Sequence, residues 1–159
     1  RAISIDPKFS QAYYGLGQLS LKKNDFEKGK ELLEQAISYD PENPLPLADL
    51  SDIYLIKGDI EKAEELAKRS VLHSPPVYQP YISMANVLFY RGRRDEAEGY
   101  YRRAVETGAT DDLIALSKIR VLRIKGDAKE ARALMKEMLE TGNLSEKMRS
   151  LIRNAYNSQ

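Results

Sequence analysis

The sequence predicts an all-α protein built as a solenoid of about four antiparallel helix hairpins. The first observation is a strict period of 34 residues, because turn-forming pairs begin at Asn24, Gly58, Gly92 and Gly126. The second is that apolar residues recur three and four positions apart on both sides of each turn, which is typical of amphipathic helices. No insertion disturbs this register, so each period is expected to hold the same structural unit, stacked on its neighbours.

Each unit is expected to be two helices joined by a tight turn. A glycine in the turn adopts the left-handed conformation that ends a helix at low cost. The aspartate that follows it can cap the next helix, and Asp127 and Glu130 have the spacing of a capping box. Pro46 and Pro80 fall near the start of the first helix of their units, where a missing N–H has no partner to lose.

Residues of similar size recur in register inside the predicted hairpins. Small residues at one position should let the two helices approach closely, while large residues fill the remaining volume. That small series is Gly29, Ala63, Ala97 and Ala131, and a large series of Leu16, Leu50 and Met84 is broken by Lys118. The tyrosines at motif positions, Tyr13, Tyr54, Tyr81 and Tyr101, are expected to pack in the core with the hydroxyl at its rim.

These patterns predict one domain over residues 1–159, with repeats at about 10–43, 44–77, 78–111 and 112–144. Residues 145–157 are expected to form a capping helix whose apolar side chains cover the last hairpin, as helical arrays require. Residues 1–7 have the pattern of the tail of a preceding repeat. The N-terminal face is therefore expected to expose apolar surface, through which the protein could self-associate.

The unit resembles the tetratricopeptide repeat, in which a large residue, a Leu-Gly-like pair, a small residue and a closing proline are spaced as they are here. The first unit carries Tyr13, Leu16-Gly17, Gly29, Leu33, Ala36 and Pro41. The second carries Leu47, Leu50-Ser51, Tyr54, Ala63, Ala67, Ser70 and Pro75, and the third Tyr81, Met84-Ala85, Leu88, Ala97, Tyr101 and Ala104. The fourth retains Ala115, Lys118-Ile119, Leu122, Ala131, Met135 and Met138, with Asn143 in place of proline. The resemblance implies a right-handed superhelix whose first helices line a concave groove for a peptide or partner segment.

Carried over position by position, the resemblance implies a groove lined by polar and charged residues. These are Tyr14, Gln18, Asp49, Asp52, Ser83, Asn86, Ser117, Arg120 and Arg123. The acidic pair and the arginine pair are expected at opposite ends of the lining, so that a ligand of mixed charge is held in one direction. The amide of Asn86 is expected to bond a peptide backbone through both its donor and its acceptor.

One subtype of the family is not expected. Domains that grip the C-terminal carboxylate of a chaperone use lysine, asparagine and arginine at set groove positions. The matching positions hold Tyr14, Gln18, Asp49, Gln79 and Ser83. Because cationic donors are missing and an aspartate repels a carboxylate, we expect no binding of such tails.

The composition excludes several other classes of protein. With no cysteine, there is no disulfide framework or thiolate metal site. The net charge of +1 does not favour duplex DNA, although residues 1–80 sum to −3 and residues 81–159 to +4. The densest basic cluster, Arg91, Arg93, Arg94, Arg102 and Arg103, is interleaved with acidic residues and predicts a salt-bridged face. No apolar run approaches the roughly 20 residues of a membrane span.

No catalytic constellation is present either. The only histidine, His73, has no nucleophile or second ligand in motif spacing, and its place near a helix end favours an interaction with the helix terminus. Gly15 and Gly17 lie within a predicted helix and follow no strand, so they are no phosphate loop. We therefore expect no enzyme activity, no cofactor and no metal site, and a cytoplasmic location is favoured.

The function favoured by these observations is a scaffold that binds a protein or peptide in its groove. A structural spacer or self-assembling array is the first alternative. The second is a segment that positions a substrate within a larger multidomain protein.

Overall fold

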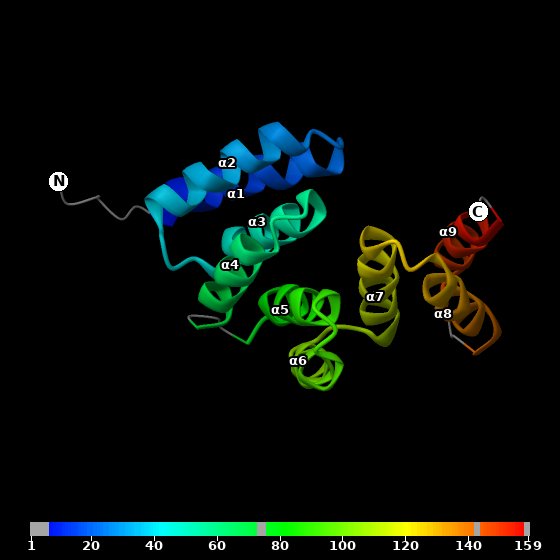
Figure 1. The fold of residues 1–159 in the computed structure, drawn as a ribbon. Helices are drawn as coiled ribbons and strands as arrows, with labels where there is room; N and C mark the ends of the chain where they lie inside the picture. The colour runs from blue at the N-terminus through cyan, green and yellow to red at the C-terminus, as the bar shows by residue number, and fades with distance from the viewer. Residues whose placement is uncertain (1–6, 73–75, 142–143, 158–159) are drawn as a thin grey trace.

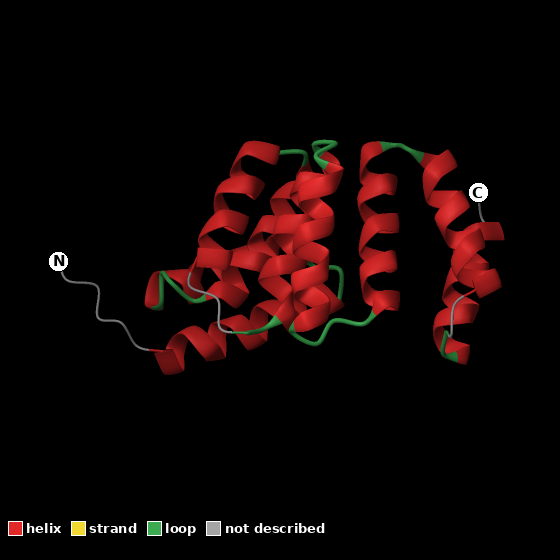
Figure 2. Cartoon of the chain, turned by 90° about the horizontal axis from the view of Figure 1, so that it is seen from below, coloured by secondary structure: helices red, strands yellow, loops and turns green. Residues whose placement is uncertain are grey.

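The computed structural model describes residues 7–72, 76–141 and 144–157. Every regular element in these ranges is an α-helix, as Figures 1 and 2 show. The helices are α1 (Pro7–Lys22), α2 (Phe26–Tyr39), α3 (Pro44–Lys57), α4 (Ile60–Leu72), α5 (Tyr78–Tyr90), α6 (Arg94–Glu106), α7 (Asp111–Lys125), α8 (Ala128–Thr141) and α9 (Glu146–Asn157). The prediction of an all-helical repeat solenoid is confirmed.

The helices form four antiparallel hairpins in chain order, α1/α2, α3/α4, α5/α6 and α7/α8, and α9 packs on α8 at the end (Figure 1). The predicted bounds of the 34-residue repeats, and the role of the helix at 145–157 as a cap, stay predictions. The predicted tail of a preceding repeat falls almost entirely on residues 1–6, and His73, Pro75 and Asn143 are also outside the described residues.

The turns inside the hairpins have the predicted left-handed residue. Gly58, Gly92 and Gly126 have φ angles of 83°, 80° and 82°. Asn24 occupies the equivalent position in the first hairpin with a φ of 61°, because asparagine tolerates this region better than most residues with a side chain. The carboxylate of Asp127 accepts a hydrogen bond from the backbone N–H of Glu130 at 3.3 Å, which confirms the predicted cap.

Side-chain size sets how closely the two helices of each hairpin approach. In the first hairpin Gly17 and Gly29 face each other, and a Cβ added to either would lie 3.5 Å from the carbonyl oxygen of the other. In the second hairpin the hydroxyl of Ser51 donates to the carbonyl of Ala63 at 2.7 Å. The fourth hairpin places a buried Ile119 at the position equivalent to Gly17. A larger side chain at the crossing requires a larger distance between axes, and α7 and α8 accordingly pack less closely.

The core is divided at α7. One cluster of buried residues runs from α1 to α7 and ends on Ile114 and Val121. A second cluster joins α7, α8 and α9 and begins on Ile119 and Leu122. Helix α7 therefore contributes one face to each cluster, and it stands between the two halves of the molecule in Figure 1.

Helix α1 exposes several large apolar side chains. Phe9, Leu16 and Leu19 are 54%, 51% and 55% exposed, whereas Leu50 and Met84, the counterparts of Leu16 in later hairpins, are buried. The expected apolar N-terminal face is present among the described residues. The self-association that it was expected to support stays a prediction.

Candidate functional site

Three adjoining hollows open on the side of the molecule formed by the first helices of the hairpins. The first, of about 340 Å³, is bounded by α1, the start of α2, α3 and α7, and the second, of about 290 Å³, by α3, α5 and α7. The third, of about 950 Å³, lies between the ends of α3 and α7 and the helix α9. Helices so far apart in the chain share a hollow only where the surface curves inward, so this side is concave. We call the three hollows together the concave groove.

Arg120 is the centre of the groove because it lines all three hollows. Its Nη2 lies 2.5 Å from Oδ2 of Asp52, although these residues are 68 positions apart and belong to α7 and α3. The expectation that the acidic and basic pairs lie at opposite ends of the groove is therefore wrong. The curvature of the solenoid brings α3 and α7 together across the third hairpin, and Coulomb attraction then pairs the two charges.

Asp49 is the second carboxylate at this centre. Its charge is less well neutralised than that of Asp52, which forms an ion pair with Arg120. Its Oδ2 accepts a hydrogen bond from the side-chain amide of Gln18 at 3.4 Å, and the same amide donates to the hydroxyl of Tyr14 at 2.6 Å. Burial, and then repulsion from Asp52, raise the pKa of Asp49 to about 6. Burial and the neighbouring Asp49 raise the pKa of Tyr14 above its ordinary value. The centre thus holds one guanidinium and two carboxyl groups, and the pKa of one of these carboxyl groups is well above its ordinary value.

Asn86 lies behind the groove surface. Its side chain is fully buried, and its Oδ1 accepts hydrogen bonds from the hydroxyls of Tyr101 at 2.9 Å and Ser117 at 2.6 Å. The expectation that its donor and acceptor both face a peptide backbone does not fit this geometry, because the acceptor is already occupied and no surface is exposed. Asn86 instead joins α5 to α6 and α7, and its Nδ2 has no partner among the described residues.

The remaining predicted residues have distinct positions in the groove. Ser83 is buried and donates to the carbonyl of Ala48 at 3.2 Å, which joins α5 to α3. Arg123 is exposed and lines the third hollow. Seven of the nine predicted residues line a hollow, namely Gln18, Asp49, Asp52, Ser83, Ser117, Arg120 and Arg123. Their contact with a partner stays a prediction.

The sequence prediction missed the apolar part of the groove. Phe26, Ile56 and Leu151 line the third hollow and are 41%, 43% and 56% exposed. These residues lie at the start of α2, the end of α3 and on α9, outside the positions that the repeat pattern assigns to the groove. The repeat pattern gave no signal for this surface, because Leu151 belongs to the segment predicted to cap the last hairpin and its 56% exposure is seen only in the structure.

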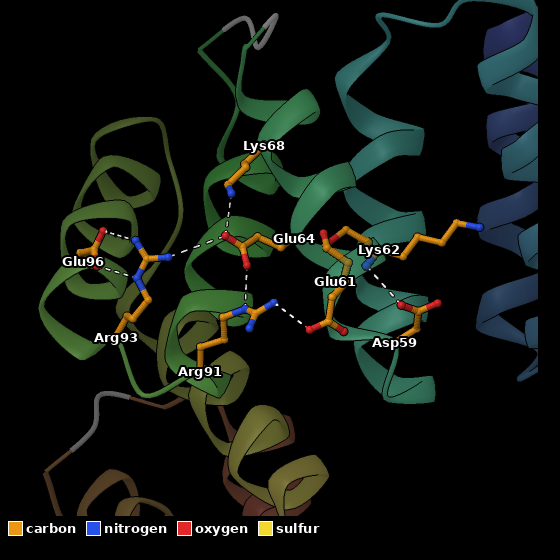
Figure 3. A network of polar contacts seen from close by, with 10 residues as sticks. Asp59, Glu61, Lys62, Glu64, Lys68, Arg91, Arg93 and Glu96 are labelled. Atoms are coloured by element: carbon orange, nitrogen blue, oxygen red, sulfur yellow. Dashed lines mark hydrogen bonds and ion pairs between the residues drawn. The ribbon is translucent and has the colours of Figure 1, made fainter.

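The arginine-rich segment lies in a separate polar network, shown in Figure 3. Glu64 of α4 is at its centre, with Nζ of Lys68 at 2.7 Å, Nε of Arg91 at 2.6 Å and Nη1 of Arg93 at 3.7 Å. Further along, both oxygens of Glu130 accept hydrogen bonds from Arg94. The predicted salt-bridged face is confirmed for these three arginines, and the network joins the second hairpin to the third.

Among the residues that the structure describes, no group of three His, Asp or Glu side chains could hold a metal ion. Within the same ranges no helix combines the length and the apolar character needed to cross a membrane.

The fold and the groove define a helical-repeat protein with a concave surface. Two family models, both described as tetratricopeptide repeat, match residues 21–85 and 82–145. The chain belongs to the tetratricopeptide repeat family, whose repeats generally mediate protein–protein interaction.

Comparison with solved structures supports the same fold. A thermophilic tetratricopeptide repeat protein of Thermus thermophilus is similar over 94% of this chain and 82% of that one, with a TM-score of 0.64 and 22% identity. MamA of AMB-1 is similar over 87% of this chain and 76% of that one, with a TM-score of 0.52 and 20% identity. No curated protein sequence matches the chain.

Proposed function

We propose that this protein is a non-enzymatic interaction module that binds a segment of a partner protein along its concave groove. The observation that carries the proposal is the continuity of the groove, because a single residue, Arg120, lines three hollows that extend from the first hairpin to α9. A linear segment that follows this surface would contact both ends of the described chain. The general role of the family in protein–protein interaction supports the proposal.

The chemistry of the groove also supports binding of a polypeptide. Its centre offers the charged side chains of Asp49, Asp52 and Arg120, while its third hollow offers apolar surface. Peptide recognition typically combines apolar anchor pockets with polar groups that fix direction. Cationic side chains remain absent from the positions that matching domains use for chaperone tails, so a peptide with such a C-terminal carboxylate is expected not to bind.

The test is a peptide-display selection against the protein, followed by binding measurements with a substitution inside the groove. Ile56 lines the first and third hollows and is 43% exposed, so Ile56→Glu should block the groove without unfolding the protein. Leu72→Glu is the matched control, because Leu72 is 76% exposed and lines none of the three hollows.

We expect enriched peptides to bind the parent and the Leu72→Glu variant equally, and the Ile56→Glu variant at least about tenfold more weakly. Equal binding to all three proteins would show that the peptides bind elsewhere, and the function would have to be sought on another surface.

A self-assembling array is the second candidate, favoured by the exposed Phe9, Leu16 and Leu19 of α1. Sedimentation over a range of concentrations separates the two. A mass that increases with concentration, and that returns to that of one chain in a Phe9→Glu/Leu16→Glu variant, would favour assembly.

A further inference from the structure

The third hollow is the largest of the three and differs from the others in the character of its lining. Apolar side chains from α7 and α9 line it, among them Leu116 and Ile119 of α7 and Met148 and Leu151 of α9. Three of the eight exposed large hydrophobic residues of the described chain, Phe26, Ile56 and Leu151, border this one space. Exposed apolar side chains that surround one concavity are typical of a binding surface.

The charges around this hollow have a single sign. Arg120 and Arg123 line it, and its lining contains no carboxylate from the described residues, whereas the first and second hollows both contain Asp49 and Asp52. Arg120 is already paired with Asp52. Arg123 is exposed and makes no ion pair with any residue in the described ranges. An available cation therefore stands at the edge of an apolar space, and it would attract a carboxylate of whatever occupies that space.

The shape of the hollow favours a helical occupant. Its lining comes almost entirely from helices, so a guest helix would pack against them by its apolar stripe, with anchors at positions i, i+3, i+4 and i+7. Met148 lines the space and is partly exposed, and its unbranched side chain can adapt to anchors of different shape.

From these contacts we propose that the third hollow binds an amphipathic helix of a partner protein, whose apolar side chains pack between α7 and α9 and whose acidic side chain pairs with Arg123. This inference rests on the proposed function and names the chemistry of the partner. Binding there would connect the end of α3 with α9, so one ligand would contact the second hairpin and the capping helix at once.

The test uses a displayed library of 16-residue amphipathic peptides, with leucine, isoleucine, methionine or phenylalanine at i, i+3, i+4 and i+7. The positions that flank the apolar stripe vary among glutamate, glutamine and lysine. We expect glutamate to be enriched over lysine at one flanking position. A synthetic peptide of the enriched sequence should bind the Arg123→Glu variant about five- to tenfold more weakly than the parent, and this difference should shrink at high salt.

Lys125→Glu is the matched control, because Lys125 is an exposed cation two residues further along α7 that does not line the hollow. It makes the same change in net charge and should leave affinity nearly unchanged. Leu151→Glu removes an apolar wall at an exposed site and should abolish binding of the same peptide.

The outcomes distinguish this inference from the general function. If peptides are lost with Ile56→Glu but bind Arg123→Glu and Lys125→Glu equally, the groove binds partners and the assigned chemistry is wrong. Enrichment of lysine over glutamate also overturns the inference. A molecular mass that increases with concentration in the parent but not in Leu151→Glu would show that a second copy of the chain occupies the hollow, which overturns it as well.

Discussion

At the scale of single residues, Asp49 lies in a surrounding that penalises its charged form. Tyr14 and Gln18 of α1, Asp52 of its own helix and Arg120 of α7 are the polar and charged groups around it. Because Asp49 is largely withdrawn from solvent, and because the neighbouring Asp52 repels its charged form, its pKa is raised to about 6. Such a carboxyl group can be neutral while the groove is empty and can become charged when a cation binds beside it.

The raised pKa of Asp49 predicts a pH-dependent cost in stability. The folded-state pKa of about 6 exceeds the value of about 3.9 for an unfolded aspartate, so the folded protein binds this proton more tightly. The favourable contribution is complete below about pH 4 and is lost as the pH rises through 6. We therefore expect Asp49→Asn to increase the free energy of unfolding by about 1–2 kcal/mol at pH 7.5 and to change it little at pH 4.

Denaturant unfolding at the two pH values measures this difference. Asp59→Asn is the control, because Asp59 is exposed and asparagine retains its capping acceptor. A stabilisation by Asp49→Asn that is equal at pH 4 and pH 7.5 would contradict the assigned origin of the cost.

The close packing around Gly29 predicts that a larger residue there would disturb the contact between α1 and α2. A Cβ at this position would lie 2.5 Å from Cδ2 and 2.9 Å from Cγ of Leu21, so alanine forces the leucine from its rotamer. We expect Gly29→Ala to lower the free energy of unfolding by about 1–3 kcal/mol. Gly15→Ala, whose Cβ would meet nothing within 4 Å, should instead raise it by about 0.5–1 kcal/mol through helix propensity.

A double-mutant cycle with Leu21→Ala isolates the collision in denaturant unfolding experiments. Gly29→Ala should cost less in the Leu21→Ala background, because the clashing atoms are gone. If Gly29→Ala cost the same in both backgrounds, the loss of stability would come from the backbone and not from the contact with Leu21.

At the scale of helices and hairpins, the network around Glu64 holds the second hairpin to the third (Figure 3). Hydrogen bonding to Lys68, and then the charges of Arg91 and Arg93, lower the pKa of Glu64. A lowered folded-state pKa contributes stability above the unfolded value of about 4.3, and this stability is lost as the pH falls through the folded-state pKa. The charged network therefore stabilises the junction above about pH 4, and this contribution is lost in acid.

We expect Glu64→Gln to lower the free energy of unfolding by about 1 kcal/mol at pH 7, and by much less near pH 3. Thermal unfolding at both pH values, at low and high salt, provides the measurement. Glu65→Gln is the control, since Glu65 makes only an exposed pair with Arg69 at 4.0 Å. A deficit that persists at pH 3 would indicate that packing, and not charge, is lost.

The hairpins are also the scale at which the sequence is most informative. Turn residues and small residues act through local geometry, so their 34-residue period predicted the pairs of helices and the buried Ala63, Ala97 and Ala131. The pairing of Arg120 with Asp52 could not be predicted in the same way, because it depends on the curvature accumulated over several hairpins. A residue such as Ile119 changes the packing of its own hairpin. A pattern shared by all the repeats does not reveal such differences between individual hairpins.

At the scale of the whole molecule, the ion pair between Asp52 and Arg120 links α3 to α7 across the groove. The side chains are 20% and 45% exposed, so the pair is expected to contribute less than about 1 kcal/mol to stability. Its greater effect should be on shape, since it restrains the distance between hairpins that are not neighbours in the chain.

We expect Arg120→Gln to lengthen and broaden the distribution of distances between the first and fourth hairpins. Because the sequence has no cysteine, spin labels on Lys28→Cys and Lys136→Cys report this distance without background in electron-resonance measurements. Glu34→Gln, which removes an ion pair with Lys30 inside α2, should leave the distribution unchanged. An unchanged distribution in Arg120→Gln would show that packing alone sets the curvature.

The division of the core at α7 has a consequence for how the chain loses its structure. The two hydrophobic clusters meet at α7 and at Phe89 of α5, and clusters joined by so few residues should behave as two cooperative units with a common boundary. Amides of α8 and α9 should exchange with solvent through openings that leave α1–α6 intact, while those of α7 report on both units. The C-terminal unit would then open and close on its own, and a guest helix seated between α7 and α9 would slow that exchange by holding the unit closed.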